Sequence, residues 1–216
     1  MKALHLVAVA AALSAGAVIA PAHATFIQDT SCGVSKCAAG TKTFIDTHNK
    51  RVSTFMMGVG SDAGPQVAVT TTGKVNTGAG FATIKPTKSD TLTDLIFTPA
   101  NDTLFDGFSF RGQLEPAGFS GDIDVIVTDS AGLVSTIDFT GVKGPDANFD
   151  RLGVVSTDGE TIKSVEVVTP GSESFKQFKH VEFSFALPPP AVAEPASVAL
   201  LGMGLVGLGL VRRRKR

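Results

Sequence analysis

Residues 122–139 read DIDVIVTDSAGLVSTIDF, and this stretch points to the fold class of the chain. In its first half every second side chain is apolar: Ile123, Val125 and Val127. A turn-forming Ser-Ala-Gly follows, and beyond it the apolar side chains that share one face are Leu133, Ile137 and Phe139. Because successive side chains of a strand point to opposite faces, this pattern predicts two antiparallel strands, each with one buried and one solvated face.

The same alternation recurs on both sides of this hairpin. Its apolar positions are Phe108 and Phe110, Val165 and Val167, and Val181, Phe183 and Phe185. The polar residues between them, which we expect on the solvent side, are Ser109, Arg111, Glu166, Glu182 and Ser184. Turn-forming residues separate these segments at Asp106–Gly107, Lys143–Pro145, Asp158–Gly159 and Pro170–Gly171. The sequence therefore predicts an all-β fold, an antiparallel β-sandwich with a jelly-roll-like strand order and no amphipathic helix.

Residues 1–24 have the three parts of a secretory signal peptide. Lys2 supplies the positive start, an apolar run follows, and Ala22 and Ala24 are the small residues that signal peptidase recognises. We expect cleavage before Thr25. The alternative is a retained membrane anchor, although the apolar run is short for a membrane span.

Residues 189–216 contain a proline-rich spacer, an acidic residue beside a proline, an uncharged segment and a terminal run of cations. The acidic residue and its proline are Glu194 and Pro195, and the uncharged Gly- and Leu-rich segment spans residues 196–211. The terminal cations are Arg212, Arg213, Arg214, Lys215 and Arg216. The uncharged segment is long enough for a short transmembrane helix, and the cations are expected to hold the C-terminus in the cytoplasm.

This order of features resembles the C-terminal tail of PEP-CTERM sorting-signal proteins, whose tripeptide is Pro-Glu-Pro. Ala193 stands here at the place of the first proline. The resemblance implies export, anchoring in the inner membrane by the C-terminal helix, and cleavage near Glu194 and Pro195 by an exosortase. It also implies a final location on the outer surface or outside the cell, where many such proteins belong to the exopolysaccharide matrix. A plain tail anchor without processing is the alternative.

The exported domain expected between these ends spans residues 25–188. It keeps 13 of the 19 basic residues of the chain and 19 of the 20 acidic ones, so it is about six units negative. This charge argues against a nucleic-acid partner and against an anionic membrane surface, because like charges repel at every phosphate.

Cys32 and Cys37 are the two cysteines of the chain and lie near the expected mature N-terminus. In an oxidising compartment such a pair predicts a small disulfide loop. A metal or redox role is the alternative, and it would need further ligands or a redox motif.

Few residues of this domain form a pattern that is typical of catalysis. His48 and His180 have no nucleophile motif beside them, and we expect both in solvated loops. Asp122 and Asp124 lie on one face of a predicted strand about 7 Å apart, a separation that glycoside hydrolysis accepts. Alternating aspartates are also ordinary on the solvent side of a sandwich. We therefore expect no enzymatic activity, and polysaccharide hydrolysis is a distant alternative.

We also expect no cofactor. The alternative is a structural calcium ion held by loop aspartates such as Asp102, Asp106, Asp146 and Asp150. Sugar platforms usually carry Trp or Tyr, and this chain has neither. The sequence thus predicts an exported protein with a structural or adhesive β-sandwich. A carbohydrate-binding module for exopolysaccharide is the alternative.

Overall fold

The computed structural model describes residues 26–32, 40–45, 48–100, 105–116, 120–143 and 151–186. Within these ranges the chain forms thirteen strands and no helix. The strands are β1 (Phe26–Gln28), β2 (Thr41–Ile45), β3 (Val52–Val59), β4 (Gln66–Gly78), β5 (Gly80–Phe81), β6 (Thr83–Pro86), β7 (Asp94–Pro99), β8 (Phe105–Glu115), β9 (Ser120–Asp129), β10 (Val134–Lys143), β11 (Arg151–Ser156), β12 (Ile162–Val168) and β13 (Ser174–Phe185). All paired strands run antiparallel, as the alternating sequence predicts.

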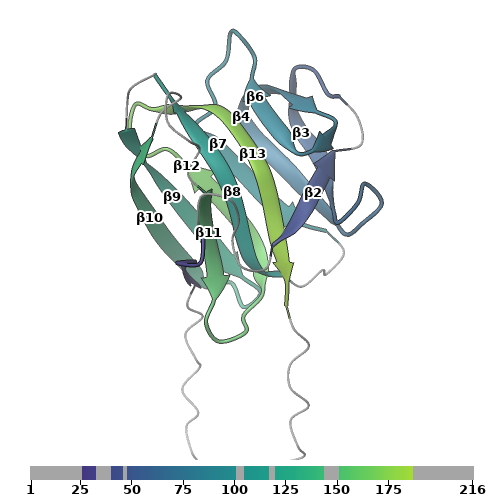
Figure 1. The fold of residues 1–216 in the computed structure, drawn as a ribbon, viewed down its shortest axis with the longest axis vertical. Helices are drawn as coiled ribbons and strands as arrows, with labels where there is room; N and C mark the ends of the chain where they lie inside the picture. The colour runs from purple at the N-terminus through teal and green to yellow at the C-terminus, as the bar shows by residue number, and fades with distance from the viewer. Residues whose placement is uncertain are drawn as a thin grey trace, which may run out of the picture.

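Eight consecutive strands, β6 to β13, form two sheets that pack face to face (Figure 1). The first sheet has the order β6-β13-β8-β11 and the second has the order β7-β12-β9-β10. After the β9–β10 hairpin the chain crosses to the first sheet, where β11 pairs with β8, and then returns to the second, where β12 pairs with β9. Such returns beside an earlier strand are Greek-key connections, and together they make the jelly-roll-like order that the sequence predicts.

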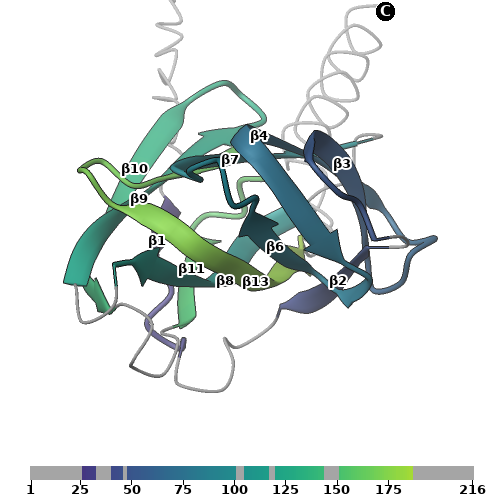
Figure 2. The same ribbon diagram turned by 90° about the horizontal axis from the view of Figure 1, so that it is seen from above.

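The N-terminal strands close one side of the sandwich. β2 extends the first sheet by pairing with β13, β4 extends the second by pairing with β7, and β3 bridges β2 and β4. Figure 2 shows β2, β3 and β4 along this closed side. β1 pairs with β11 at the far end of the same path, so the hydrogen-bonded ring of strands is open between β1 and β10.

Phenylalanine rings fill the space between the two sheets. Phe97 of β7 lies against Phe108 of β8 and Phe178 of β13, with ring centroids 5.1 and 5.6 Å apart. Phe110 stacks on Phe178 at 4.5 Å. All four side chains are buried, and each contributes about 1.5–3 kcal/mol by leaving water. Because the two contacts of Phe97 join strands of opposite sheets, they help to hold the sandwich together.

The hairpin predicted from residues 122–139 is confirmed as β9 and β10, with Val125 of β9 opposite Ile137 of β10. The apolar positions of β9 are fully buried, whereas Leu133 is 41% exposed. The expectation that Leu133 shares the core face of β10 is therefore wrong. This residue belongs to the turn, where its N–H donates a hydrogen bond to Asp129 Oδ1 at 2.7 Å.

Three expectations for β8 and β13 are also wrong. Asp106–Gly107 is not a turn but lies inside β8, where β11 and β13 pair with it on both sides. Ser109 and Glu182 are not on the solvent side but are buried, because Arg151 of β11 reaches across β8 to contact both. Phe185, expected in the core, is 44% exposed where β13 ends.

Candidate functional site

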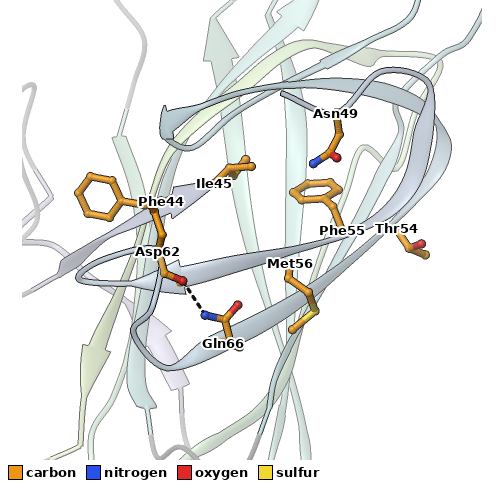
Figure 3. Close-up of a pocket in the computed structure, with 9 residues that line it drawn as sticks. Phe44, Ile45, Asn49, Thr54, Phe55, Met56, Asp62 and Gln66 are labelled. Atoms are coloured by element: carbon orange, nitrogen blue, oxygen red, sulfur yellow. Dashed lines mark hydrogen bonds between the residues drawn. The ribbon is translucent and has the colours of Figure 1, made fainter. Parts of the chain in front are cut away.

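A pocket of about 360 Å³ lies on the side of the sandwich that the N-terminal strands cover, beside β2, β3 and the β3–β4 turn. Figure 3 shows its lining side chains: Phe44, Ile45, Asn49, Thr54, Phe55, Met56, Asp62 and Gln66. Ile45 and Phe55 belong to the hydrophobic core, whereas Met56 is 46% exposed. The pocket therefore leads from solvent to the core and offers both apolar contacts and polar groups, as small-molecule sites do.

The β3–β4 turn fixes the polar wall of this pocket. Gln66 Nε2 donates a hydrogen bond to the main-chain oxygen of Asp62 at 2.9 Å, which Figure 3 shows as a dashed line. It donates a second hydrogen bond to the main-chain oxygen of Gly64 at 2.8 Å. Because both hydrogens of the amide are used, its oxygen is left to accept a hydrogen bond from a ligand. A Cβ atom at Gly58 would overlap the main-chain oxygen of Ser61, so the turn requires glycine at this position.

An aromatic patch, formed by Phe44, Phe81 and His180, lies on the outer face of the first sheet, which is the face turned away from the core. The ring of Phe81 lies 6.3 Å from that of Phe44, and His180 stacks on Phe81 at 4.3 Å. Lys42 Nζ is 5.2 Å from the centroid of Phe81, within range of a cation–π interaction. All three rings are partly exposed. Since Phe44 also lines the pocket, the patch and the pocket adjoin.

His180 has a φ of 55°, a backbone conformation that is uncommon outside glycine and that Asn, Asp and His adopt more readily than other residues. The register of β13 against β8 shifts between Lys179 and Glu182, so His180 lies in a β-bulge. Its pKa is lowered, chiefly by burial and then by the positive charges of Arg111 and Lys179. The expectation of a solvated loop is therefore wrong for His180, because this residue belongs to β13 and its ring packs on Phe81.

Three cations lie side by side on the same outer face, and we name them the cationic row: Arg151, Arg111 and Lys179. The strand register places Arg111 of β8 opposite Arg151 of β11 and opposite Lys179 of β13. Arg151 forms a buried salt bridge with Glu182 and donates a hydrogen bond to Ser109 Oγ at 3.2 Å. Burial, followed by the charge of Arg111, lowers the pKa of Lys179. The row thus gathers like charges in direct opposition, which costs stability.

The carboxylates considered for glycoside hydrolysis lie on the outer face of the second sheet. Asp122 is exposed, and its Oδ1 accepts a hydrogen bond from the Gly141 N–H at 3.1 Å. Asp124 lies opposite Asp138 of β10. The pKa of Asp124 is raised, first by burial and then by the charges of Asp138 and Asp122. The register of β10 against β9 shifts between Phe139 and Val142, and Asp122 supports the main chain of β10 there. Asp124 belongs to a cross-strand carboxylate pair.

The other residues considered for chemistry are dispersed. His48 lies in an exposed loop, as predicted, where its Nδ1 accepts a hydrogen bond from the Ala79 N–H at 3.3 Å. Asp106 lies in β8 and not in a calcium-binding loop. The other three aspartates considered for calcium lie outside the described residues: Asp102, Asp146 and Asp150. In the described part of the chain, no three His, Cys, Asp or Glu side chains are grouped as metal ligands would be.

The residues predicted for targeting all lie outside the described ranges: Ala22, Ala24, Glu194, Pro195 and the cations Arg212 to Arg216. Cys37 lies outside them as well, whereas Cys32 follows β1, so the disulfide between the two cysteines stays a prediction. Among the residues that the structure describes, no helix has the length and apolar character needed to cross a membrane.

Comparison with known proteins identifies the C-terminal tail. Residues 191–215 match the family model of the PEP-CTERM protein-sorting motif. No curated protein and no solved structure matches the chain significantly. The match includes Ala193, Glu194 and Pro195, so the missing first proline does not prevent it. Such a motif marks an exported protein that is anchored at the membrane before an exosortase processes it. The chain therefore carries a PEP-CTERM protein-sorting motif and is a PEP-CTERM sorting-signal protein.

Proposed function

We propose that this chain is an exported cell-surface or extracellular-matrix protein whose β-sandwich has a structural or adhesive role and no catalytic one. The observation that carries this proposal is the sorting motif at residues 191–215. The fold supports it, because interlocking phenylalanines such as Phe97, Phe108 and Phe178 give a rigid domain that can present its outer faces to a matrix.

The proposed route uses both ends of the chain. Residues 1–24 direct export, with Ala22 and Ala24 as the signal-peptidase recognition residues. The helix of residues 196–211 then holds the domain at the outer side of the inner membrane, with the terminal cations in the cytoplasm. An exosortase cuts near Glu194 and Pro195, and residues 25–188 reach the outer surface or the medium as the mature domain.

The contacts of the candidate catalytic groups support a role without chemistry. His180 is committed to a ring stack on Phe81 and has a lowered pKa. Asp122 accepts a main-chain hydrogen bond from Gly141 in β10. These contacts are consistent with structural roles for both groups and support our proposal of a domain without hydrolytic activity.

Carbohydrate binding is a second candidate function, because two neighbouring aromatic rings near the pocket lie outside the core. Phe44 and Phe81 are only partly buried, and Phe44 borders a pocket that also offers Gln66 and Asn49. Aromatic faces beside amide groups suit the apolar and hydroxyl-bearing faces of a sugar ring. In such a site, phenylalanine would provide the aromatic surface for the sugar that Trp or Tyr usually provides.

Fractionation of the native host tests the proposed function. In cells with an active exosortase, the protein should be found on the outer surface or in the medium without its tail. In a strain that lacks the exosortase, it should accumulate in the inner membrane with the tail intact. An Ala193→Pro variant, which completes the Pro-Glu-Pro tripeptide, should be processed at least as well. The same fraction and the same mass in both strains would contradict the proposal.

A further inference from the structure

We propose that the pocket beside β2, β3 and the β3–β4 turn binds one uncharged sugar unit, at the end or on a branch of a neutral polysaccharide. The inference rests on the proposed function, because an exported domain meets such polymers only outside the cell. It deepens the second candidate, carbohydrate binding, because it names the chemical class of the sugar, the groups that hold it and the part of the polymer that enters the pocket.

The charge of the pocket favours an uncharged ligand. Of the nine residues that line it, none is lysine, arginine or histidine, and the one acidic residue is Asp62. A ligand with a carboxylate or phosphate group finds no cation among them, and the domain as a whole is about six units negative. Anionic sugars are therefore disfavoured, because their charge would lose water without gaining a partner.

The pocket combines an apolar floor with hydrogen-bonding walls. Phe55 and Ile45, both buried, close it toward the core. In Figure 3 the side chain of Asn49 lies on one side of the Phe55 ring, and that of Gln66 lies on the other. A sugar ring has a matching character, because its C–H groups pack on apolar side chains while its hydroxyl groups form hydrogen bonds with amides.

Two polar groups in the pocket suit the hydroxyl groups of a sugar. The two N–H groups of Gln66 Nε2 are engaged by the β3–β4 turn, so its Oε1 serves as an acceptor for a ligand. Thr54 adds a hydroxyl group at an exposed position of β3, which can both donate and accept. A neutral sugar offers hydroxyl groups that can donate to the first and exchange hydrogen bonds with the second.

The main chain around the pocket is ordered without a ligand. At one wall the Asn49 N–H donates to Thr77 Oγ1 at 3.0 Å, and the Thr77 N–H donates to the main-chain oxygen of Asn49 at 2.9 Å. At the other wall the Gly64 N–H donates to the main-chain oxygen of Ser61 at 3.0 Å, inside the β3–β4 turn. Because these segments are already fixed, a ligand binds there with less loss of conformational entropy.

The size of the pocket suits one sugar unit. Its volume of about 360 Å³ lies near the lower limit of small-molecule sites, which is about 300 Å³. Since Ile45 and Phe55 close its inner side, the rest of the polymer lies outside, beside Phe44. The ring of Phe44 is partly exposed and lies 6.3 Å from that of Phe81, so the two rings offer apolar surface to the next unit of the chain.

Calorimetric titration of the mature protein purified from its host tests the site. The probes are three neutral polysaccharides, dextran, mannan and galactan, with the acidic polymer alginate as the contrast. We expect saturable binding to at least one neutral polymer and none to alginate. The affinity should change by less than about twofold between about 0.05 and about 0.5 M NaCl, because no charged ligand group is screened.

The free monosaccharide of the bound polymer should displace it, because a single unit fills the pocket. The competitors are glucose for dextran, mannose for mannan and galactose for galactan. Failure to bind any of the three neutral polymers would overturn the inference. Equal affinity for alginate, or a monosaccharide that does not compete, would overturn it as well.

Paired substitutions then locate the site. Phe44→Leu with Thr54→Val removes an aromatic surface and a hydroxyl group from the pocket and should weaken binding by about tenfold or more. Phe185→Leu with Thr136→Val is the matched control, because it makes the same changes at exposed positions outside the pocket lining. The control should change the affinity by less than about twofold. Equal losses in the two double variants would overturn the assignment.

Two further measurements separate the possible failures. Thermal unfolding of each variant shows whether a loss of binding reflects a loss of the fold, and only variants that unfold within a few degrees of the wild type are compared. The mass of the purified protein shows whether its tail was processed. A processed, folded protein that binds no neutral polysaccharide overturns this inference and leaves the structural or adhesive function standing. A protein that keeps its tail contradicts the proposed function, whatever it binds.

Discussion

Arg151 of β11 and Glu182 of β13 form a buried salt bridge across the strand that separates them, β8. Ser109 of β8 completes the contact by accepting a hydrogen bond from the same guanidinium. The main chain at Gly40 lies against the carboxylate, since a Cβ atom there would be 2.5 Å from Glu182 Oε2. Two opposite charges are thus removed from water together. Removing either partner would leave the other charge buried alone and would lower the free energy of unfolding.

Glu182→Gln should be strongly destabilising. The change leaves the Arg151 charge buried without its carboxylate, which costs about 3–5 kcal/mol of unfolding free energy. Urea denaturation of the mature domain measures this loss. The double change Arg151→Met and Glu182→Leu removes both charges and should cost much less than Glu182→Gln alone. If Glu182→Gln were as stable as the wild type, the pair would not be buried in solution.

Asp94→Asn should stabilise the domain at neutral pH. Burial, together with the charge and hydrogen bond of Glu166, raises the pKa of Asp94 to about 6. A carboxyl with a raised pKa in the folded state disfavours folding once it ionises, so the cost is absent below about pH 4 and complete above about pH 6. Because the group is partly exposed, we expect a gain of only about 1 kcal/mol at pH 7.5 and none at pH 3.5.

Chemical denaturation at these two pH values measures the gain of Asp94→Asn. Asp62→Asn, on the exposed β3–β4 turn, is the matched control and should be neutral at both. A gain of the same size at pH 3.5 would show that the ionisation of Asp94 is not its cause.

His180→Asn should reduce the acid sensitivity of the domain. The pKa of His180 is lowered in the folded state, so the unfolded chain takes up a proton first as the pH falls below about 6.5. Stability therefore falls from about pH 7 downward until His180 titrates in the folded state. Asparagine tolerates a positive φ and does not titrate, so the variant should lose less stability over this range. His48→Asn is the control, and an unchanged pH profile for His180→Asn would refute the prediction.

The local part of this account was predictable from sequence, and the long-range part was not. The β9–β10 hairpin and the sorting tail were read correctly, because an alternating pattern and a linear motif each lie within one short stretch. The jelly-roll-like order followed from the number of short strands and their turns. Strand alternation also placed Val165, Val167 and Phe183 in the core, where the structure confirms them.

The side-chain arrangement on the outer face of the first sheet could not be predicted from the sequence in the same way. Alternation predicted solvent exposure for Ser109 and Glu182, but the register brings Arg151 beside them from a distant part of the sequence. The bulge at His180 leaves the apolar pattern of β13 intact and so gives no signal in the sequence. The partial exposure of Phe44 and Phe81 could not be predicted for a similar reason, since apolar residues in strand segments are expected in the core.

Replacing Cys32 and Cys37 with serine should lower the stability of the mature domain by about 2 kcal/mol. A disulfide that closes so short a loop restricts the unfolded chain only modestly. Thermal unfolding with and without reductant measures the effect, and reductant should shift the wild type but not the double variant. A wild type that is insensitive to reductant would argue against the predicted disulfide.

The intact mass of the protein recovered from the envelope and the medium of its native host tests the central claim most directly. We predict a product without residues 1–24 whose C-terminus lies near Glu194 and Pro195, found on the outer surface or in the medium. A membrane-bound product that keeps its tail to Arg216 would contradict processing by an exosortase.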